Sequence, residues 1–579
     1  MTKMKEKEML AEITPIIGTP EIRAAAEILK QYRQGKANLE KRIIENDQWF
    51  KMRHWQQFRK NAREGDPEPA SAWLFNSLAN KHADAMDNYP EPNVLPREES
   101  DRNTAQALSA ILPVVLERSH FEQVYSDVWW KKLKSGTGVY GVFWNTRLEN
   151  GLGEIDIRPV DLLNLFWEPG IRDLQDSRNL FTVELVDNEV LEEEYPQLAG
   201  TLHGASLDVG RYLYDDSIDT SEKSAVVDWY YKRGGVLHYC KFVNETVLFA
   251  SENDPVLRET GWYEHGQYPF VMDVLFPDEG TPAGFGYVDV MKDCQMYIDK
   301  LNQALMRHAL MASRKRYFIR DNGSVNEKEF ADWNRDFIHV AGSGLGQDSI
   351  REVDVGNLDS TIPTMLSQKI EELKETSGNR DFSQGSPSGG VTAASAIAAL
   401  QEAGNKLSRD MIKGSYFAFV QVNYLCIELI RQFYTEPRCF RITGDEGETF
   451  QHIDNRGLRP QPQGSAFGLD LGSRLPVFDI RVTSQKSSPF HKAAQNELAK
   501  ELFTMGFFRP DMGEQALAVL EMMDFEGKEL VRRSVSKNLQ MQKQLVQMQQ
   551  QLTQLAQVTV SAVPKEEPDI SDGEEGEIL

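Results

Sequence analysis

The sequence predicts an α+β protein that is mostly helical. Apolar residues at three- and four-residue spacing indicate helices at 285–312, 358–380 and 392–434, and a short stretch of mixed character separates the first two. Strand-like alternation is concentrated before residue 284 and between 435 and 489. Helical patterning then resumes and continues almost to the C-terminus.

The N-terminal part, 1–284, combines helices with strands. A long charged helix is expected from Ile22 to Lys60 and a second from Ala72 to Met86. A third, from Ser100 to Ser135, should bend at Pro113. The strand candidates are 139–144, 154–158 and 180–185, with a tight hairpin of 226–231 and 236–240 around Gly234-Gly235.

Two amphipathic helices flank the insert. The first follows a turn rich in Gly and Pro, and the second has Pro363 in its first turn and should end at Gly378. The apolar face of the first is Met291, Cys294, Ile298, Leu301, Leu305 and His308, and that of the second is Ile362, Leu366, Ile370 and Leu373. The expected water-facing residues of the first are Lys292, Gln295, Asp299, Lys300, Gln303 and Arg307.

The insert, 313–357, is predicted to be a small α/β unit. Residues 316–320 alternate as a strand, and Ser324 with Glu327 is spaced as a capping box for a short helix. Two more strand candidates follow, at 337–340 and 350–355.

Residues 381–391 are predicted to form a mobile loop, because Gly and Pro occur too densely for a helix. The helix at 392–434 can be capped by Thr392. Its first turns are rich in alanine, which either lets a neighbouring helix pack closely or simply reflects helix propensity. The loop contains Phe382, Ser383, Gln384, Gly385, Ser386, Pro387, Ser388, Gly389 and Gly390.

The C-terminal region, 490–559, is predicted to be helical, and 560–579 is an acidic tail too poor in apolar residues to fold alone. Copies of the last helix could pack side by side, or the helix could lie on its own domain. Its heptad seam is Met541, Leu545, Met548, Leu552 and Leu555.

Composition limits the classes of protein. A chain of 579 residues is too long for one ordinary core, so about three or four compact units are expected. No stretch reaches the roughly 18 to 20 apolar residues of a membrane span. The charged start lacks the apolar core of a secretory signal, so we expect a protein that works or is assembled in a cytosol.

No catalytic or metal-binding signature is found, and no cofactor is expected. Cys240, Cys294, Cys426 and Cys439 lack metal-ligand spacing and are not expected to form disulfides. The ten histidines contain no His-Glu-x-x-His pair, and no Walker-type phosphate loop is present. Any ATP hydrolysis is therefore expected from a partner.

The formal net charge of −24 at pH 7 argues against static gripping of duplex DNA, which usually requires a basic footprint. An acidic channel wall would instead let a duplex slide, because repulsion keeps phosphates off the surface. The same charge could simply confer solubility. Lys369, Lys374 and Arg380 are the basic residues that could face a channel lumen, with a solvated or inter-subunit ion-pair role as the alternative.

The order of these segments resembles the portal, or head-to-tail connector, proteins of tailed double-stranded DNA bacteriophages. Two motifs add to the likeness: the aromatic strand and acidic-proline turn at 166–173, and the strand 478–482 before a Ser-Ser-Pro sequence. The resemblance covers most of the chain. It implies a wing at 1–284, stem helices at 285–312 and 358–380, a clip at 313–357, a tunnel loop at 381–391, a long bent wing helix at 392–434, wing strands at 435–489 and a helical crown at 490–559.

The resemblance also implies a non-enzymatic virion protein at the portal vertex of a capsid, assembled in the host bacterial cytoplasm, with no membrane. About twelve copies would close into a ring whose channel passes double-stranded DNA during packaging and ejection. The implied partners are the terminase packaging motor, the capsid protein and head-tail adaptor proteins. Docking is expected at clip residues Arg316, Arg320, Asn322, Trp333 and Arg335, and the loop Phe382 to Gly390 is expected to line the narrowest part of the channel.

Two other classes of protein remain open from the residues alone. One is a non-viral cytosolic scaffold built on the C-terminal heptads, which would form a dimer or trimer. The other is a nucleic-acid enzyme that uses dispersed carboxylates with Mg²⁺, which would show metal-dependent activity.

Overall fold

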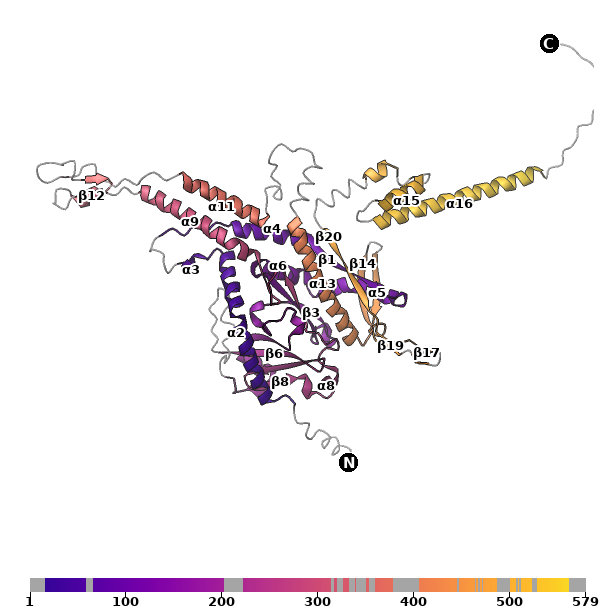
Figure 1. The fold of residues 1–579 in the computed structure, drawn as a ribbon. Coiled ribbons are helices and arrows are strands. Elements are labelled where there is room, and N and C mark those ends of the chain that lie inside the picture. Colours follow the sequence, from indigo (N-terminus) through magenta and orange to yellow (C-terminus); the bar gives the residue numbers. More distant parts are fainter. Residues whose placement is uncertain are drawn as a thin grey trace, which may run out of the picture. The chain divides into compact units, whose positions relative to one another are not determined.

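The structure is a computed structural model with two compact units, Met1–Gln485 and Lys486–Leu579. Helices and antiparallel strands build the first unit, and the described part of the second is helical (Figure 1). This mixture confirms the α+β class. The described residues are 16–58, 66–202, 222–313, 317–319, 326–332, 339, 350–352, 360–378, 406–444, 447–463, 465–466, 469–470, 472–486, 500–506, 509, 512–522 and 528–561.

A five-stranded antiparallel sheet carries the N-terminal helix α2 (Thr19–Phe50) on one face. Ile22, Ala25 and Leu29 of α2 recur at helical spacing and pack on strand residues such as Phe181 and Val227. The turn between the central strands is Gly234-Gly235, with φ of 60° and 84°, as a two-residue hairpin requires. The strand order is β4 (Leu165–Trp167), β5 (Asn179–Asp187), β6 (Lys223–Arg233), β7 (Val236–Val243) and β8 (Thr246–Ala250).

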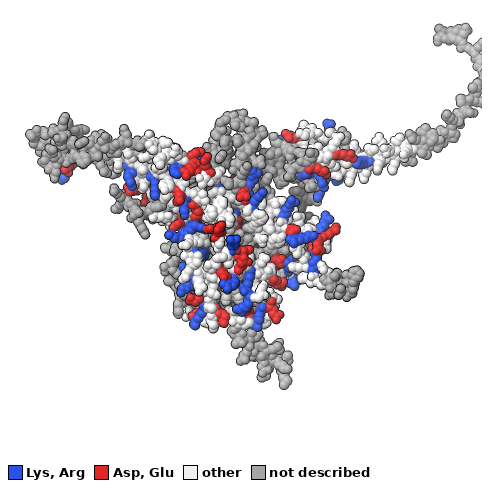
Figure 2. Space-filling model, in the orientation of Figure 1, with Lys and Arg blue, Asp and Glu red and all other residues white. Residues whose placement is uncertain are grey.

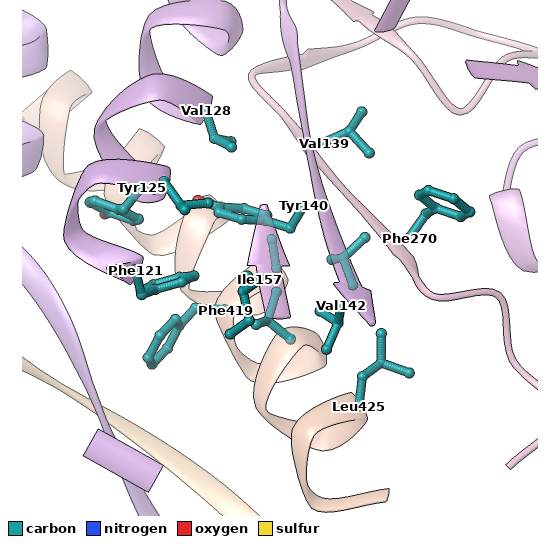
Figure 3. Packing of buried hydrophobic residues seen from close by; sticks show 14 of the residues in the cluster. Phe121, Tyr125, Val128, Val139, Tyr140, Val142, Ile157, Phe270, Phe419 and Leu425 are labelled. Carbon is teal, nitrogen blue, oxygen red and sulfur yellow. The ribbon is translucent and has the colours of Figure 1, made fainter. Parts of the chain in front are cut away.

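A three-stranded sheet forms the centre of the main core. Its order is β3 (Glu154–Val160), β2 (Thr137–Asn145) and β9 (Phe270–Val274). Helix α6 (Phe121–Ser135) and the long helix α13 (Lys406–Phe433) pack on it. Figure 3 shows Phe121 of α6 next to Phe419 of α13, with ring centroids 5.5 Å apart, and near Tyr140 of β2. Helices far apart in the chain therefore share one core.

A buried ion pair joins the same three elements. Lys132 of α6 donates to Asp273 Oδ1 of β9 at 2.6 Å and to Ser415 Oγ of α13 at 2.7 Å. Ser415 Oγ donates in turn to Asp273 Oδ2 at 2.5 Å. All three residues are 0–1 % exposed, so each charge depends on the other for its solvation.

The first helix of the chain is shorter than predicted. The sequence predicts one helix from Ile22 to Lys60, but α2 ends at Phe50 and the chain turns at Met52, whose φ is 57°. The turn lets the His54 ring stack on Trp49, with centroids 4.1 Å apart. A short helix, α3 (Trp55–Phe58), follows, and α4 (Trp73–Asp87) matches the second predicted helix.

The single helix predicted from Ser100 to Ser135 is instead two helices. The first, α5 (Arg102–Arg118), contains Pro113, and the chain turns after it at His120, whose φ is 51°. The turn allows α5 to pack on strand β1 (Asn88–Pro96) while α6 packs on β2. Strand β1 itself was not predicted, because its prolines hide a strand that pairs on the edge with β20 (Phe478–Lys486).

Two segments of backbone lie very close together where helix α9 (Tyr287–Ser313) begins. Helix α6 is terminated by Gly136, whose backbone is in the left-handed region with φ 85°. A Cβ on Gly136 would lie 2.2 Å from the carbonyl carbon of Phe285. A Cβ on Gly286 would lie 2.8 Å from the Gly136 nitrogen. Glycine is therefore required at both positions of this junction.

Several of the remaining elements, above all the short ones, were not predicted individually from the sequence. Strand β14 (Arg438–Gly444) pairs with β15 (Gly447–Ile453) next to α5. In the second unit, α15 (Gly513–Met522) packs on α16 (Lys528–Ser561), which contains the predicted heptads. The other short elements are α7 (Asn188–Glu194), α8 (Leu257–Thr260), β10 (Phe276–Pro277), β11 (Gly284–Phe285), β16 (Gln461–Pro462), β17 (Ser465–Ala466), β18 (Leu469–Asp470) and β19 (Ser473–Arg474).

Replacing Lys132 by Met should destabilise the first unit by about 3–5 kcal/mol, because Asp273 would be left as an uncompensated buried charge. Adding Asp273→Leu should recover part of this loss, since the double variant buries no charge. Urea unfolding of the full chain followed by near-ultraviolet circular dichroism measures both. Lys30→Met, at an exposed position on α2, is the control, and equal stability of Lys132→Met and Lys30→Met would contradict the assigned role.

Candidate functional site

Two antiparallel helices extend from the main core as a pair (Figure 1). They are α9 (Tyr287–Ser313) and α11 (Thr361–Ser377), close to the predicted 285–312 and 358–380. Helix α11 ends as predicted, with Gly378 at φ 71°. Cys294 Sγ of α9 donates to the Lys369 carbonyl of α11 at 3.3 Å, which fixes where the two helices cross.

The first half of α9 is anchored in the main core. Tyr287, Val288, Met291 and Ile298 are buried, and α2, α4 and α6 all contact this half. The predicted burial of Met291 and Ile298 is thus confirmed. On α11, Leu373 is buried and the other three predicted apolar residues are half-buried.

Two residues expected to face water are instead buried: Gln295 and Asp299 are 2 % and 1 % exposed. The physical reason is a segment that the sequence did not place, residues 66–72, which we call the strap. Asp299 Oδ1 accepts from the Ser71 backbone N–H at 3.0 Å, and the Gln295 amide donates to the Ser71 carbonyl at 2.9 Å. The polar stripe of α9 therefore satisfies the backbone of an extended segment instead of facing solvent.

The strap follows α9 outward for three helical turns. Asn302 donates to Ser71 Oγ at 3.2 Å, Gln303 to the Pro67 carbonyl at 2.9 Å, and Arg307 to Asp66 at 2.6 Å. At the inner end, His54 Nε2 lies 3.0 Å from Asp299 Oδ2. The strap thus links the end of α2 to the helix pair by polar contacts.

The outer part of the pair presents apolar side chains to solvent. Tyr297, Met306 and Leu310 of α9 are 51 %, 49 % and 51 % exposed, and Met365 of α11 is 46 % exposed. Within a single chain these side chains remain largely uncovered. Exposed apolar side chains of this kind, here on more than one face of α9, are typical of surfaces that other proteins cover.

The predicted lumen residues differ in their surroundings. Lys369 donates to Glu372 at 2.6 Å, and this hydrogen bond raises the pKa of the exposed ammonium. Lys374 Nζ lies 5.8 Å from the centre of the Trp73 ring of α4. Arg380 lies outside the described residues, as do the loop residues Phe382 to Gly390.

The insert between the helices is described only in part. Strands β12 (Tyr317–Ile319) and β13 (Ile350–Glu352) pair, and α10 (Glu327–Ala331) is capped by Asn326, not by Ser324 as predicted. Of the strand predicted at 337–340, only residue 339 is described. The predicted docking residues Arg316, Arg320, Asn322, Trp333 and Arg335 lie outside the described residues.

One buried cluster has the residue types of a hydrolase. Ser251 Oγ lies 3.4 Å from His238 Nδ1, and His238 Nε2 lies 3.7 Å from Glu252 Oε1. Glu252 is already held by Arg233 at 2.9 Å and by the Tyr231 hydroxyl at 3.0 Å. Ser251, His238 and Glu252 are at most 4 % exposed, so a substrate has no access and we assign the cluster a structural role.

The surface charges, the possible metal ligands and the helices further limit the kinds of functional site. On the face shown in Figure 2, basic and acidic side chains are interspersed over the described surface. Among the described residues, no group of three or more His, Cys, Asp or Glu side chains could hold a metal ion. No helix in the described ranges has the length and apolar character that a bilayer span needs.

Comparison with models of protein families gives a match. The family model described as phage P22-like portal protein matches residues 82–267 and 235–568 of this chain. The two matches together span most of the sequence, including α9, α11 and α13. No curated protein matches the chain.

Asp299→Ala should release the strap, because the Ser71 N–H and the Gln295 amide lose a shared buried acceptor. The expected cost is about 1–3 kcal/mol, with faster hydrogen exchange at residues 66–74. Mass spectrometry of exchanged, digested protein measures this directly. Asp293→Ala, at an exposed position on the same helix, should leave exchange unchanged, and equal protection in the two variants would show that the strap is held otherwise.

Proposed function

This chain belongs to the phage P22-like portal protein family, and we propose that its copies close into a ring that conducts double-stranded DNA across one vertex of a capsid. Membership implies a portal function in a virion, with an oligomeric ring and capsid and terminase partners. The proposal concerns how the residues of this chain carry out that function.

The observation that carries the proposal is the set of exposed apolar side chains on α9 and α11. Tyr297, Met306, Leu310 and Met365 are about half exposed in one chain, and the helix pairs of the two neighbouring copies, one on each side, would cover them. Head-to-tail contacts of this kind form a closed ring when the rotation between subunits closes. We propose about twelve copies, with the helix pairs surrounding the channel as the stem.

The loop Phe382 to Gly390 is proposed to line the narrowest part of the channel. Small polar residues offer a sliding duplex few fixed contacts. Lys369 and Lys374 are proposed to contact the DNA backbone where they face the lumen. The ion pair of Lys369 with Glu372 supports a weak contact, because it offsets the lysine charge.

Net charge supports transport over static binding. The chain carries −24 at pH 7, and on the face in Figure 2 the charges of both signs are mixed over its described part. A wall of this kind lowers the affinity for phosphates, so DNA can move through a ring without being held.

The outer ends of the subunit are proposed to bind other proteins. Segment 313–357 would dock the terminase motor during packaging and the head-tail adaptors afterwards, through Arg316, Arg320, Asn322, Trp333 and Arg335. In the second unit, Met541, Leu545, Met548 and Leu552 of α16 are 50–66 % exposed. Copies of α16 are proposed to pack along this seam as a helical crown.

The same seam also favours the second candidate, a scaffold that associates only through α16. The two proposals differ in stoichiometry. Native mass spectrometry of the purified chain should show a closed oligomer of about twelve copies, and negative-stain images should show rings with an aperture. A dimer or trimer would favour the scaffold. Leu545→Asp, in the α16 seam, should abolish a coiled-coil dimer but leave a ring held by the helix pairs.

Deleting 382–390 tests the channel assignment. Rings should still assemble, since the exposed apolar side chains of α9 and α11 are unchanged, while DNA packaging or retention fails because the proposed constriction is lost. Negative-stain imaging of the rings and the DNA content of purified heads measure the two effects. Replacing the nine residues by a Gly/Ser sequence of equal length is the control, and normal genome-filled heads from the deletion would contradict the assignment.

A further inference from the structure

Helix α4 lies where three elements of the proposed channel meet. It contacts α9, α11 and α13. In the sequence, α11 precedes residues 379–405 and α13 follows them, so α4 contacts the helix before this segment and the helix after it. The contacts on the two sides differ in chemistry.

On the side of α11, which we call the outgoing side, the last turns of the helix are buried against the core. Leu373 and Ser377 are 1 % and 0 % exposed, whereas most of α11 is exposed. The Lys374 ammonium lies 5.8 Å from the Trp73 ring centre, within the range of a cation–π contact. Gly378 then ends the helix in the left-handed conformation.

On the returning side, one hydrogen bond fixes the first turn of α13. Ser408 Oγ donates to Asp84 Oδ2 of α4 at 2.8 Å. Ser408 is 8 % exposed, and Met411 and Ile412, one turn further on, are buried. Burial raises the pKa of the Asp84 carboxyl, and the Ser408 hydrogen bond counters this by stabilising the carboxylate.

Between the two contacts, Lys81 ties α4 to the base of α9. Lys81 is 2 % exposed, and its Nζ lies 4.6 Å from the Tyr287 ring centre. Burial lowers the pKa of Lys81 to about 8, while the negative charge of Asp84 one turn away raises it. The positive charge of Lys81 in turn lowers the pKa of Asp84 and so helps to keep its carboxylate ionised.

We propose that α4 fixes the positions of α11 and α13, the helices on either side of residues 379–405, and we call α4 the seat. Asp84 is the positioning residue for α13, and Trp73 is the positioning residue for α11. Asp84 acts through Ser408, and Trp73 acts through Lys374. The seat rests on the proposed function only for its consequence: it would set where the proposed constriction stands in the channel.

The experiment is hydrogen exchange of the assembled full-length protein at residues 406–412. Asp84→Ala and Ser408→Ala should each speed exchange about tenfold, as expected for a lost hydrogen bond to a charged group. The double variant should exchange no faster than either single one, because both remove the same bond. Asp84→Asn keeps an acceptor oxygen and should restore most of the protection.

Asp87→Ala is the matched control, because Asp87 is an exposed carboxylate at the end of the same helix. Its exchange at 406–412 should equal that of the unmodified chain. Additive effects of Asp84→Ala and Ser408→Ala, or unchanged exchange in either, would overturn the seat. The outgoing side has its own measurement: Trp73→Ala should speed exchange at 373–378, and Trp73→Phe, which keeps an aromatic face, should not.

Failure of the seat and failure of the channel function give different results. Exchange reports only on α4 and its neighbours, whereas genome retention reports on DNA passage. If deletion of 382–390 leaves heads full while Asp84→Ala still speeds exchange, the channel assignment falls and the seat stands. If the deletion empties heads and Asp84→Ala changes nothing at 406–412, the seat falls alone.

Discussion

The buried ion pair between Lys132 and Asp273 sets the frame of the first unit. It joins α6, β9 and α13, and Ser415 closes the triangle between elements 141 to 283 residues apart in the chain. A buried charge is costly in free energy when its partner is absent or displaced. This contact therefore favours one register of α13 against the sheet. At the far end of α13, Tyr434 donates to the buried carboxylate of Glu154, which fixes the end of the long helix as well.

The helix pair is held by a different kind of contact. Its inner half packs by apolar burial, while the polar stripe of α9 fastens to the strap through directional hydrogen bonds from Gln295 to Arg307. Hydrogen bonds fix register more sharply than apolar contacts do, because donor and acceptor must align. The exposed apolar side chains of α9 and α11 are only partly covered within the chain, so in the proposed ring they can contact neighbouring copies.

Much of the fold could be predicted from the sequence, because helical spacing, turn glycines and strand alternation are local signals. The ends of α11 and the hairpin at Gly234-Gly235 followed from such signals. The breaks at Met52 and His120 did not, since tertiary packing imposes a left-handed backbone there and few non-glycine residues adopt it. For Gln295 and Asp299, periodicity indicated a water-facing stripe, and only the path of the strap explains their burial. Lys132 carried a signal that could have been used: it stands in register with Val124 and Val128 on the buried face of α6. Of the candidate site, the two helices could be predicted, whereas the side chains proposed to meet DNA or partners stay predictions.

The close backbone contact between Gly136 and Phe285-Gly286 limits how α9 can move relative to the main core. Here the backbones of two chain segments lie in close contact with no side chain between them. The N-terminal end of α9 therefore cannot shift along or toward the other segment. The 27 residues of α9 extend about 40 Å from that end. A tilt of about 5° at the junction would therefore swing the distal tip by about 3–4 Å. In the proposed ring, a tilt of this size in every copy would change the diameter of the channel by several ångströms.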